Sequence, residues 1–129
     1  MRARVEVFLL IGVGAALGAN MRYLLGQLVT QRLGSGFPYG TLLINVLGSL
    51  GIGLFLGLVG TPYEPSSAWR LLIVTGFLGG FTTFSTFSYE TYTLFALGRW
   101  QDALLYAFGS VAIGLAATAM GVRMSQFVA

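Results

Sequence analysis

The stretch GFLGGFTTFSTFSYE, residues 76–90, decides how this chain folds. It lies inside an apolar segment, yet it contains a glycine pair, five hydroxyl residues set among phenylalanines, and a final carboxylate. Glycine, serine and threonine favour helix poorly, so the stretch predicts a helix that breaks near Gly79–Thr83. Backbone groups freed by a break are tolerated in a membrane only inside protein or beside an aqueous cavity. The stretch therefore predicts a broken, pathway-lining helix.

The composition indicates a membrane protein. Of the 129 residues, 56% are hydrophobic and only 9% are charged, and the mean hydropathy is +0.82. A soluble domain has roughly a quarter charged residues, and a small soluble domain leaves too much surface exposed to hide this much apolar area. We therefore expect an all-α integral membrane protein with one domain, residues 1–129.

The residue types exclude several classes of chemistry. The chain has no cysteine and no histidine, which removes thiol chemistry, disulfides, Cys/His metal sites and imidazole catalysis. Its seven cations are all arginine and are scattered singly, as is typical of membrane-edge anchors and not of a nucleic-acid surface. The chain has only four acidic residues, so few pairs of carboxylates could serve in catalysis. We predict no enzyme activity, no organic cofactor and no nucleic-acid partner.

Four apolar segments meet the roughly 20 residues that a membrane helix needs. Short connections containing Gly, Pro, Ser or Asp separate them. The predicted spans are residues 5–29, 41–59, 71–97 and 103–122. The first 20 residues also fit a cleavable signal peptide, but the apolar pattern resumes directly after Arg22, which favours an uncleaved helix.

The arginines give almost no orientation signal. If the helices alternate, four arginines lie on one side of the membrane and three on the other, whereas orientation normally follows a clear excess. Either the first helix alone decides the orientation, or the chain inserts both ways and forms an antiparallel homodimer. We favour the dual-topology dimer, because four short helices poorly enclose a pathway and a symmetric pair closes it.

Polar and small residues line three of the spans at helical spacing, four residues apart. The lines are Gly14, Gly18, Arg22 and Gly26; Thr41, Asn45, Ser49, Gly53 and Gly57; and Tyr106, Ser110, Gly114 and Thr118. For the glycines, close helix packing is the favoured interpretation. The Asn45 amide must face a partner group or a water-filled path, and these two interpretations stay equally supported.

Two ionisable residues lie well inside apolar segments. A charge there is costly and often functional. Arg22 lies near the end of its span, so it either anchors the helix at the membrane edge or serves the function. Glu90 either caps a polar network or lines a vestibule.

The residues after the predicted break suit an anion. Phe84, Phe87, Ser88 and Thr91 share one helix face. Phenyl rings have positive edges, which can stabilise an anion in a narrow path, and the hydroxyls add donors. Simple packing of the two rings is the alternative. The carbonyls freed at the break are natural ligands for a hard monovalent cation.

The whole chain resembles the Fluc (CrcB-type) fluoride channels, on the motifs GTLLIN in the second span and Gly-Gly-x-Thr-Thr-Phe-Ser-Thr-Phe in the third. The resemblance implies an antiparallel, dual-topology homodimer in a prokaryotic inner membrane. In the bilayer, this dimer exports fluoride passively from the cytoplasm through two pores, with a structural sodium at its centre.

The resemblance also implies residue roles. It gives the pore to Asn45, Phe84, Phe87, Tyr106 and Ser110, and the backbone oxygens of Gly79 and Thr82 to sodium. Thr41 and Ser88 are further candidate donors to fluoride. Thr83, Ser85 and Thr86 complete the hydroxyl-rich break, and Arg22 and Glu90 match positions near the vestibules. One departure is Gly114, which stands where some relatives have a second hydroxyl on the fourth helix.

Two other functions compete with a fluoride channel. A small proton-coupled multidrug or cation exporter of the dual-topology type needs a mid-membrane carboxylate, and Glu6 and Glu90 fit that pattern poorly. A purely structural membrane subunit explains the glycines but not the clustered hydroxyls and phenylalanines.

Overall fold

The computed structural model describes residues 2–129, and their side chains from residue 4 onward. The side chain of Arg2, one of the arginines counted for orientation, lies outside this part. The elements are α1 (Arg2–Leu33), α2 (Tyr39–Leu56), α3 (Ser67–Trp69), η1 (Arg70–Leu78), α4 (Gly79–Phe81), α5 (Phe84–Ala96) and α6 (Trp100–Val128). Four stretches are long and apolar enough to cross a bilayer: Arg4–Leu33, Tyr39–Leu56, Ser67–Ala96 and Trp100–Val128. The chain is therefore a multi-pass membrane protein with four spans.

The helix ends differ from the predicted spans in an informative way. All four helical stretches begin before the predicted apolar segments, because helix continues into the more polar membrane edges. The second ends earlier than predicted, at Leu56, and turns follow it. Gly60, with φ of 80°, lies in this connection in a left-handed conformation that suits glycine.

The third span is broken, as predicted. Residues 70–78 form a π-helix, in which the wider turn lets the Gly79 N–H reach the Val74 carbonyl. The break itself lies at Thr82 and Thr83, whose backbones are extended, with ψ of 159° and 115°. Gly79 is helical, with φ of −62° and ψ of −39°. The break thus lies after the glycine pair, and the threonines form it.

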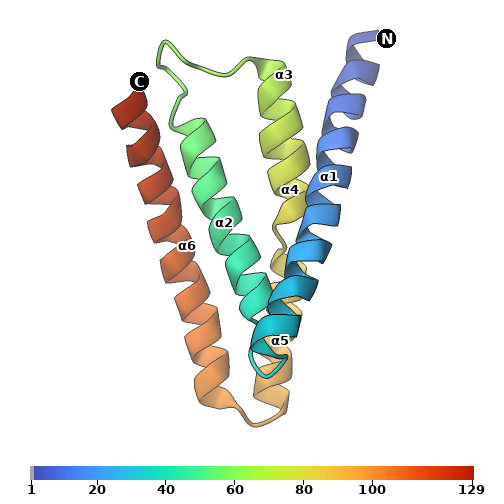
Figure 1. Cartoon of the computed structure of the whole chain (residues 1–129), viewed down its shortest axis with the longest axis vertical. Helices are drawn as coiled ribbons and strands as arrows, with labels where there is room; N and C mark the ends of the chain where they lie inside the picture. The colour runs from blue at the N-terminus through green and yellow to red at the C-terminus, as the bar shows by residue number, and fades with distance from the viewer. Residues whose placement is uncertain (1) are drawn as a thin grey trace.

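The helices associate as two pairs, α1 with η1 and α4, and α2 with α6 (Figure 1). Glycines bring the first pair into backbone contact: a Cβ at Gly14 would overlap the Leu72 carbonyl oxygen, and one at Gly18 would overlap the Phe77 carbonyl oxygen. In the second pair, a Cβ at Gly53 would overlap the backbone of α6. The packing interpretation is confirmed for these glycines.

Both termini lie at one end of the molecule, where the outer helices diverge (Figure 1). At the opposite end, Leu94, Ala103 and Tyr106 form a small buried cluster between α5 and α6. This cluster fixes the second half of the broken span against α6. It thereby places the hydroxyl-rich face of α5 beside α2.

Candidate functional site

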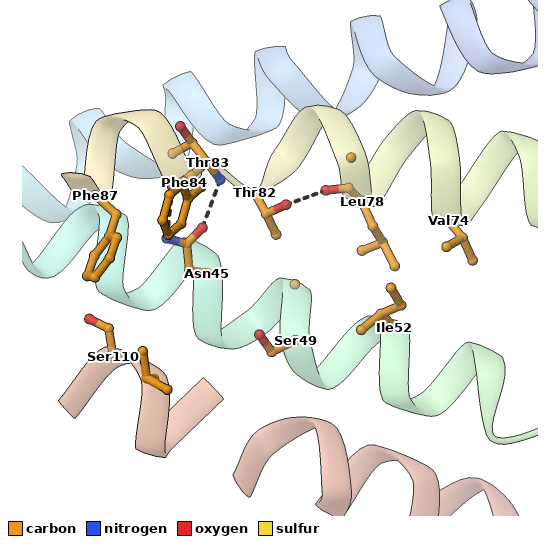
Figure 2. A pocket seen from close by; sticks show the side chains of 13 residues that line it. Asn45, Ser49, Ile52, Val74, Leu78, Thr82, Thr83, Phe84, Phe87 and Ser110 are labelled. Carbon is orange, nitrogen blue, oxygen red and sulfur yellow. Dashed lines mark hydrogen bonds between the residues drawn. The ribbon is translucent and has the colours of Figure 1, made fainter. Parts of the chain in front are cut away.

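Asn45 on α2 closes the break in the third span. Its Nδ2 donates a hydrogen bond to the Thr83 carbonyl at 3.1 Å, and the Thr83 N–H donates to its Oδ1 at 2.8 Å (Figure 2). One turn along α2, Gly48 has no side chain, and a Cβ there would overlap Cγ2 of Thr82. Gly48 thus lets α2 approach the break closely enough for the Asn45 amide to replace the missing helical partners. The cross-linking role expected of Asn45 is present; its pore role stays a prediction.

The break releases the backbone carbonyls of residues 79–82, and those of Gly79 and Thr82 are the two predicted to bind sodium. In a continuous helix, the N–H groups of Thr83 and Thr86 would donate to the carbonyls of Gly79 and Thr82. The Thr83 N–H bonds to Asn45 instead, and the Thr86 N–H donates to Oγ1 of Thr83 at 3.3 Å. Thr83 is thus the N-cap of α5, a position that threonine favours. The carbonyls of Gly79 and Thr82 are left for other partners.

Arg22 occupies one side of the released Thr82 carbonyl. Its Nη1 donates to that oxygen at 3.3 Å, so α1 is tied directly to the break. A carbonyl oxygen has two lone pairs, so Thr82 keeps capacity for a second partner. The structure therefore places the half-buried Arg22 guanidinium at the break.

A cavity of about 410 Å³, here called the central cavity, opens beside the break. Figure 2 shows the Phe84 and Phe87 rings close to Asn45, with Ser49 and Ser110 on the facing helices. The two ring centroids are 5.6 Å apart, with the rings tilted by 43°. The cavity is lined by Asn45, Gly48, Ser49, Ile52, Val74, Leu78, Gly79, Thr82, Thr83, Phe84, Phe87, Ser110 and Val111.

Two features of the central cavity stand out. The hydroxyl of Ser110 is buried and, within the described part of the chain, has no hydrogen-bond partner. Phe84 is 79% exposed, although it lies in the middle of a membrane span. The cavity therefore combines a buried hydroxyl that lacks a hydrogen-bond partner with an uncovered aromatic ring.

A second cavity of about 670 Å³, the outer vestibule, lies toward the end that carries the α1–α2 and α5–α6 turns. Arg22, Thr41, Thr86, Glu90 and Arg99 are among its lining residues. Thr83 lines both cavities, so the vestibule and the central cavity adjoin at the break.

Arg99 holds the rim of the outer vestibule together. Its Nη2 lies 2.7 Å from Oδ2 of Asp102, and its Nη1 donates to the Gly36 carbonyl in the α1–α2 turn. This arginine therefore joins the two turns on either side of the vestibule mouth.

Glu90 lies in a hydrogen-bonded network that joins three helices. Thr41 Oγ1 donates to Glu90 Oε1 at 2.9 Å, and the Tyr106 hydroxyl donates to Glu90 Oε2 at 2.7 Å. Tyr106 is only 1% exposed, and its ring packs 5.2 Å from Phe87 and 5.5 Å from Phe37. The expected polar network around Glu90 is confirmed, although sequence named none of its partners. Phe37 was missed, because it lies in a turn with no periodic pattern.

The remaining predicted residues are placed less uniformly. Ser85 and Thr86 surround the Thr83 hydroxyl, at 3.4 and 3.0 Å between oxygens. Ser88 donates to the carbonyl of Phe84, four residues earlier, and lines neither cavity. An ideal Cβ at Gly114 would lie 3.5 Å from Oγ of Ser49. Ser49 thus supplies a hydroxyl beside the position where Gly114 has none.

Comparison with known proteins places the chain in a family. Residues 9–122 match the family model described as "CrcB-like protein, Camphor Resistance (CrcB)". A protein of Chloroflexus aurantiacus is 51% identical over 119 residues, which cover 92% of this chain and 94% of the relative. One of a Roseiflexus species is 52% identical over 116 residues, covering 90% and 94%. One of Thermus thermophilus is 49% identical over 120 residues, covering 93% and 95%.

All three relatives carry the name "Fluoride-specific ion channel FluC". The matches extend over most of both chains, so they include all four spans and the broken third helix. The resemblance seen in the glycine, threonine and phenylalanine motif is thereby confirmed, and the chain belongs to the CrcB-like family.

Proposed function

We propose that this chain is a passive, fluoride-selective channel that lets fluoride leave the cytoplasm across a bacterial inner membrane, and that it is not an enzyme. The names of its relatives support fluoride as the transported ion. The observation that carries the proposal is the central cavity, where the unpartnered Ser110 hydroxyl and the exposed Phe84 ring lie together.

The chemistry of the central cavity suits a small, strongly hydrated anion. Removing water from such an ion requires compensating hydrogen-bond donors. Ser110 and Ser49 offer hydroxyls, and the tilted rings of Phe84 and Phe87 can present positive edges. The chain has no lysine, and the cavity lining contains no arginine. Donors without a full charge favour conduction, because an ion must be able to leave each site.

A second copy of the chain would complete the cavity. The open central cavity leaves polar groups at membrane depth, among them the Ser110 hydroxyl, without a covering partner in one protomer. Polar groups at that depth need protein or water around them. We infer an antiparallel homodimer, consistent with the nearly equal arginine counts on the two membrane sides.

The released carbonyls of Gly79 and Thr82 fit a structural sodium at the dimer centre. Unwound backbone carbonyls are known ligands for this ion in membrane proteins. One protomer supplies two such oxygens, and an antiparallel partner would double the number. Thr82 can serve sodium and Arg22 together, since a carbonyl oxygen has two lone pairs. Sodium would hold the two breaks together and would not itself be transported.

The test is ion efflux from liposomes that contain the purified protein. We expect rapid fluoride release, negligible chloride release, and no requirement for a proton gradient. Trapped fluoride would refute the channel. A strict proton dependence would instead support the exporter, for which Glu90 is the candidate carboxylate inside a span.

Phe84→Ile and Phe87→Ile test the aromatic contribution. Each removes a ring from the central cavity and should lower fluoride efflux at least tenfold, while the protein stays folded and assembled. Phe108→Ile is the matched control, because Phe108 is 72% exposed in a span and lines neither cavity. Equal efflux in all three variants would show that the two rings only pack.

A further inference from the structure

A third cavity lies on the outer side of α1 and α2, away from the outer vestibule. It is an apolar groove of about 640 Å³, within the range of about 300–1,000 Å³ that is usual for small-molecule sites. Here called the outer groove, it is lined by Leu25, Leu28, Val29, Arg32, Leu33, Tyr39, Leu42, Leu43, Val46 and Ile113. None of these residues lines the central cavity or the outer vestibule.

The close crossing of α1 and α2 separates the outer groove from the outer vestibule. An ideal Cβ at Gly40 would lie 3.4 Å from the Cα of Gly26, so the two helices touch through backbone atoms there. Both glycines line the vestibule, and the larger side chains on the other side of the crossing form the groove. Val29, only 9% exposed, is its most deeply buried residue.

The polar residues of the outer groove are gathered at one end. Arg32 is in the last turn of α1, and Tyr39 is the first residue of α2. Arginine and tyrosine at helix ends lie at the level of lipid headgroups. No carboxylate among the residues that the structure describes forms an ion pair with Arg32, which is exposed. Its guanidinium is thus available to an external anion.

The rest of the outer groove is apolar and has the depth of part of one leaflet. From Arg32 to Leu25 on α1, and from Tyr39 to Val46 on α2, the chain advances seven residues, or about 10 Å at the helical rise. Half of a bilayer hydrocarbon core is about 15 Å thick. An acyl chain entering beside Arg32 would therefore run along leucine and valine side chains for most of that depth.

We propose that the outer groove binds an anionic phospholipid, with its phosphate on Arg32 and Tyr39 and one acyl chain along Leu43 and Val46. The guanidinium supplies the charge and a planar set of donors that matches phosphate geometry. The tyrosine hydroxyl adds a donor. The apolar walls favour a ligand that has an acyl chain over a soluble phosphate. This site is independent of the proposed ion path, and its test does not require channel activity.

The experiment is native mass spectrometry of the purified full-length protein, titrated with phosphatidylglycerol or with phosphatidylcholine of the same acyl chains. We expect phosphatidylglycerol to bind about fivefold more tightly, the preference that one basic residue provides at an anionic surface. Arg32→Gln should abolish that preference. Arg123→Gln is the matched control, since Arg123 is an exposed arginine outside the groove and should leave the preference unchanged.

A second variant tests the chain-binding part. Leu43→Trp fills the outer groove with a larger side chain and should weaken binding of both lipids while Arg32 is intact; circular dichroism and the gel-filtration volume report whether it is folded. Equal phosphatidylglycerol binding by the wild type and Arg32→Gln would overturn the proposal. Full competition by soluble glycerol phosphate would also overturn it, because the site would then recognise a free phosphate.

Discussion

The two halves of the third span are held in place by different means. The first half, η1 and α4, contacts α1 through backbone: ideal Cβ atoms at Gly76 and Gly80 would lie 2.8 and 2.6 Å from carbonyl oxygens of α1. The second half, α5, is held by side chains: the buried cluster of Leu94, Ala103 and Tyr106, and hydrogen bonds at Thr83 and Glu90. The backbone-packed half provides a rigid frame, and the hydrogen-bonded half carries the exposed Phe84 and the hydroxyls.

Breaking the packed half should have the largest effect on stability. In Gly18→Val, the new side chain would overlap the Phe77 carbonyl oxygen, a backbone atom that cannot rotate away, so the cost should exceed the about 1–3 kcal/mol that is usual for overpacking. We expect a large fall in the melting temperature and in the yield of assembled protein. Gly12→Val is the control, because an added Cβ at Gly12 meets nothing within 4 Å. Equal stability of the two variants would contradict the assigned packing.

Removing the Asn45 amide should have the next largest effect. Asn45→Leu leaves the Thr83 N–H and carbonyl unpaired, at about 1–3 kcal/mol for each group. We expect faster hydrogen exchange at the break, measured by mass spectrometry of peptides spanning it, and a lower melting temperature. Asn20→Leu is the control, since Asn20 is exposed and bonds only within α1. Unchanged exchange at the break would show that Asn45 does not hold it closed.

The Glu90 network should contribute less. Tyr106→Phe removes one hydrogen bond to a carboxylate, worth about 1.5–3 kcal/mol, and keeps the buried ring. We expect a moderate decrease in thermal stability, while α6 stays packed against its neighbours. Tyr92→Phe on α5 provides the comparison, because Tyr92 is 69% exposed. If both variants melt alike, the Tyr106 hydroxyl does not stabilise the network.

Phe84→Ile should separate stability from transport. Its effect on the free energy of unfolding should be within about 0.5 kcal/mol, as is usual for exposed positions. The melting temperature should stay constant although fluoride efflux falls. A clear loss of stability would mean that Phe84 belongs to the packed frame of the protomer or of its dimer.

Gly114→Ser should have the smallest effect of all. Its Cβ would make an ordinary contact with Ser49 Oγ at 3.5 Å, so it adds a hydroxyl without a clash. We expect an unchanged melting temperature and fluoride efflux within about twofold of wild type in the liposome assay, since Ser49 already supplies a hydroxyl there. A strong gain in efflux would show that Ser49 does not replace the missing group.

Sequence predicted the four spans and the broken third helix, because hydropathy and helix propensity are local properties. It assigned the break partly to the glycine pair, whereas Gly79 is helical, Gly80 packs against α1, and Thr82 and Thr83 are extended. The π-helix at residues 70–78 was not foreseen, since wider helical turns have no compositional signature.

For the site, sequence identified the chemical groups better than their partners. Glu90 was recognised as a carboxylate inside an apolar segment, but its donors Thr41 and Tyr106 lie 49 and 16 residues away, and only the tertiary fold brings them together. For Arg22, sequence left open whether the side chain anchors the helix at the membrane edge or serves the function. The structure shows that it donates a hydrogen bond to the Thr82 carbonyl at the break. The roles of the predicted residues toward fluoride and sodium stay predictions until ion flux and binding are measured.

The backbone contact between α1 and η1 has a consequence for engineering the protein. The groups that an added side chain would strike at Gly14 and Gly18 are the carbonyl oxygens of Leu72 and Phe77. Every amino acid carries that oxygen, so no substitution at the facing position can relieve the clash. A saturation library at these glycines should yield no second-site suppressors in η1, and redesign of this contact must move a helix instead of exchanging a side chain.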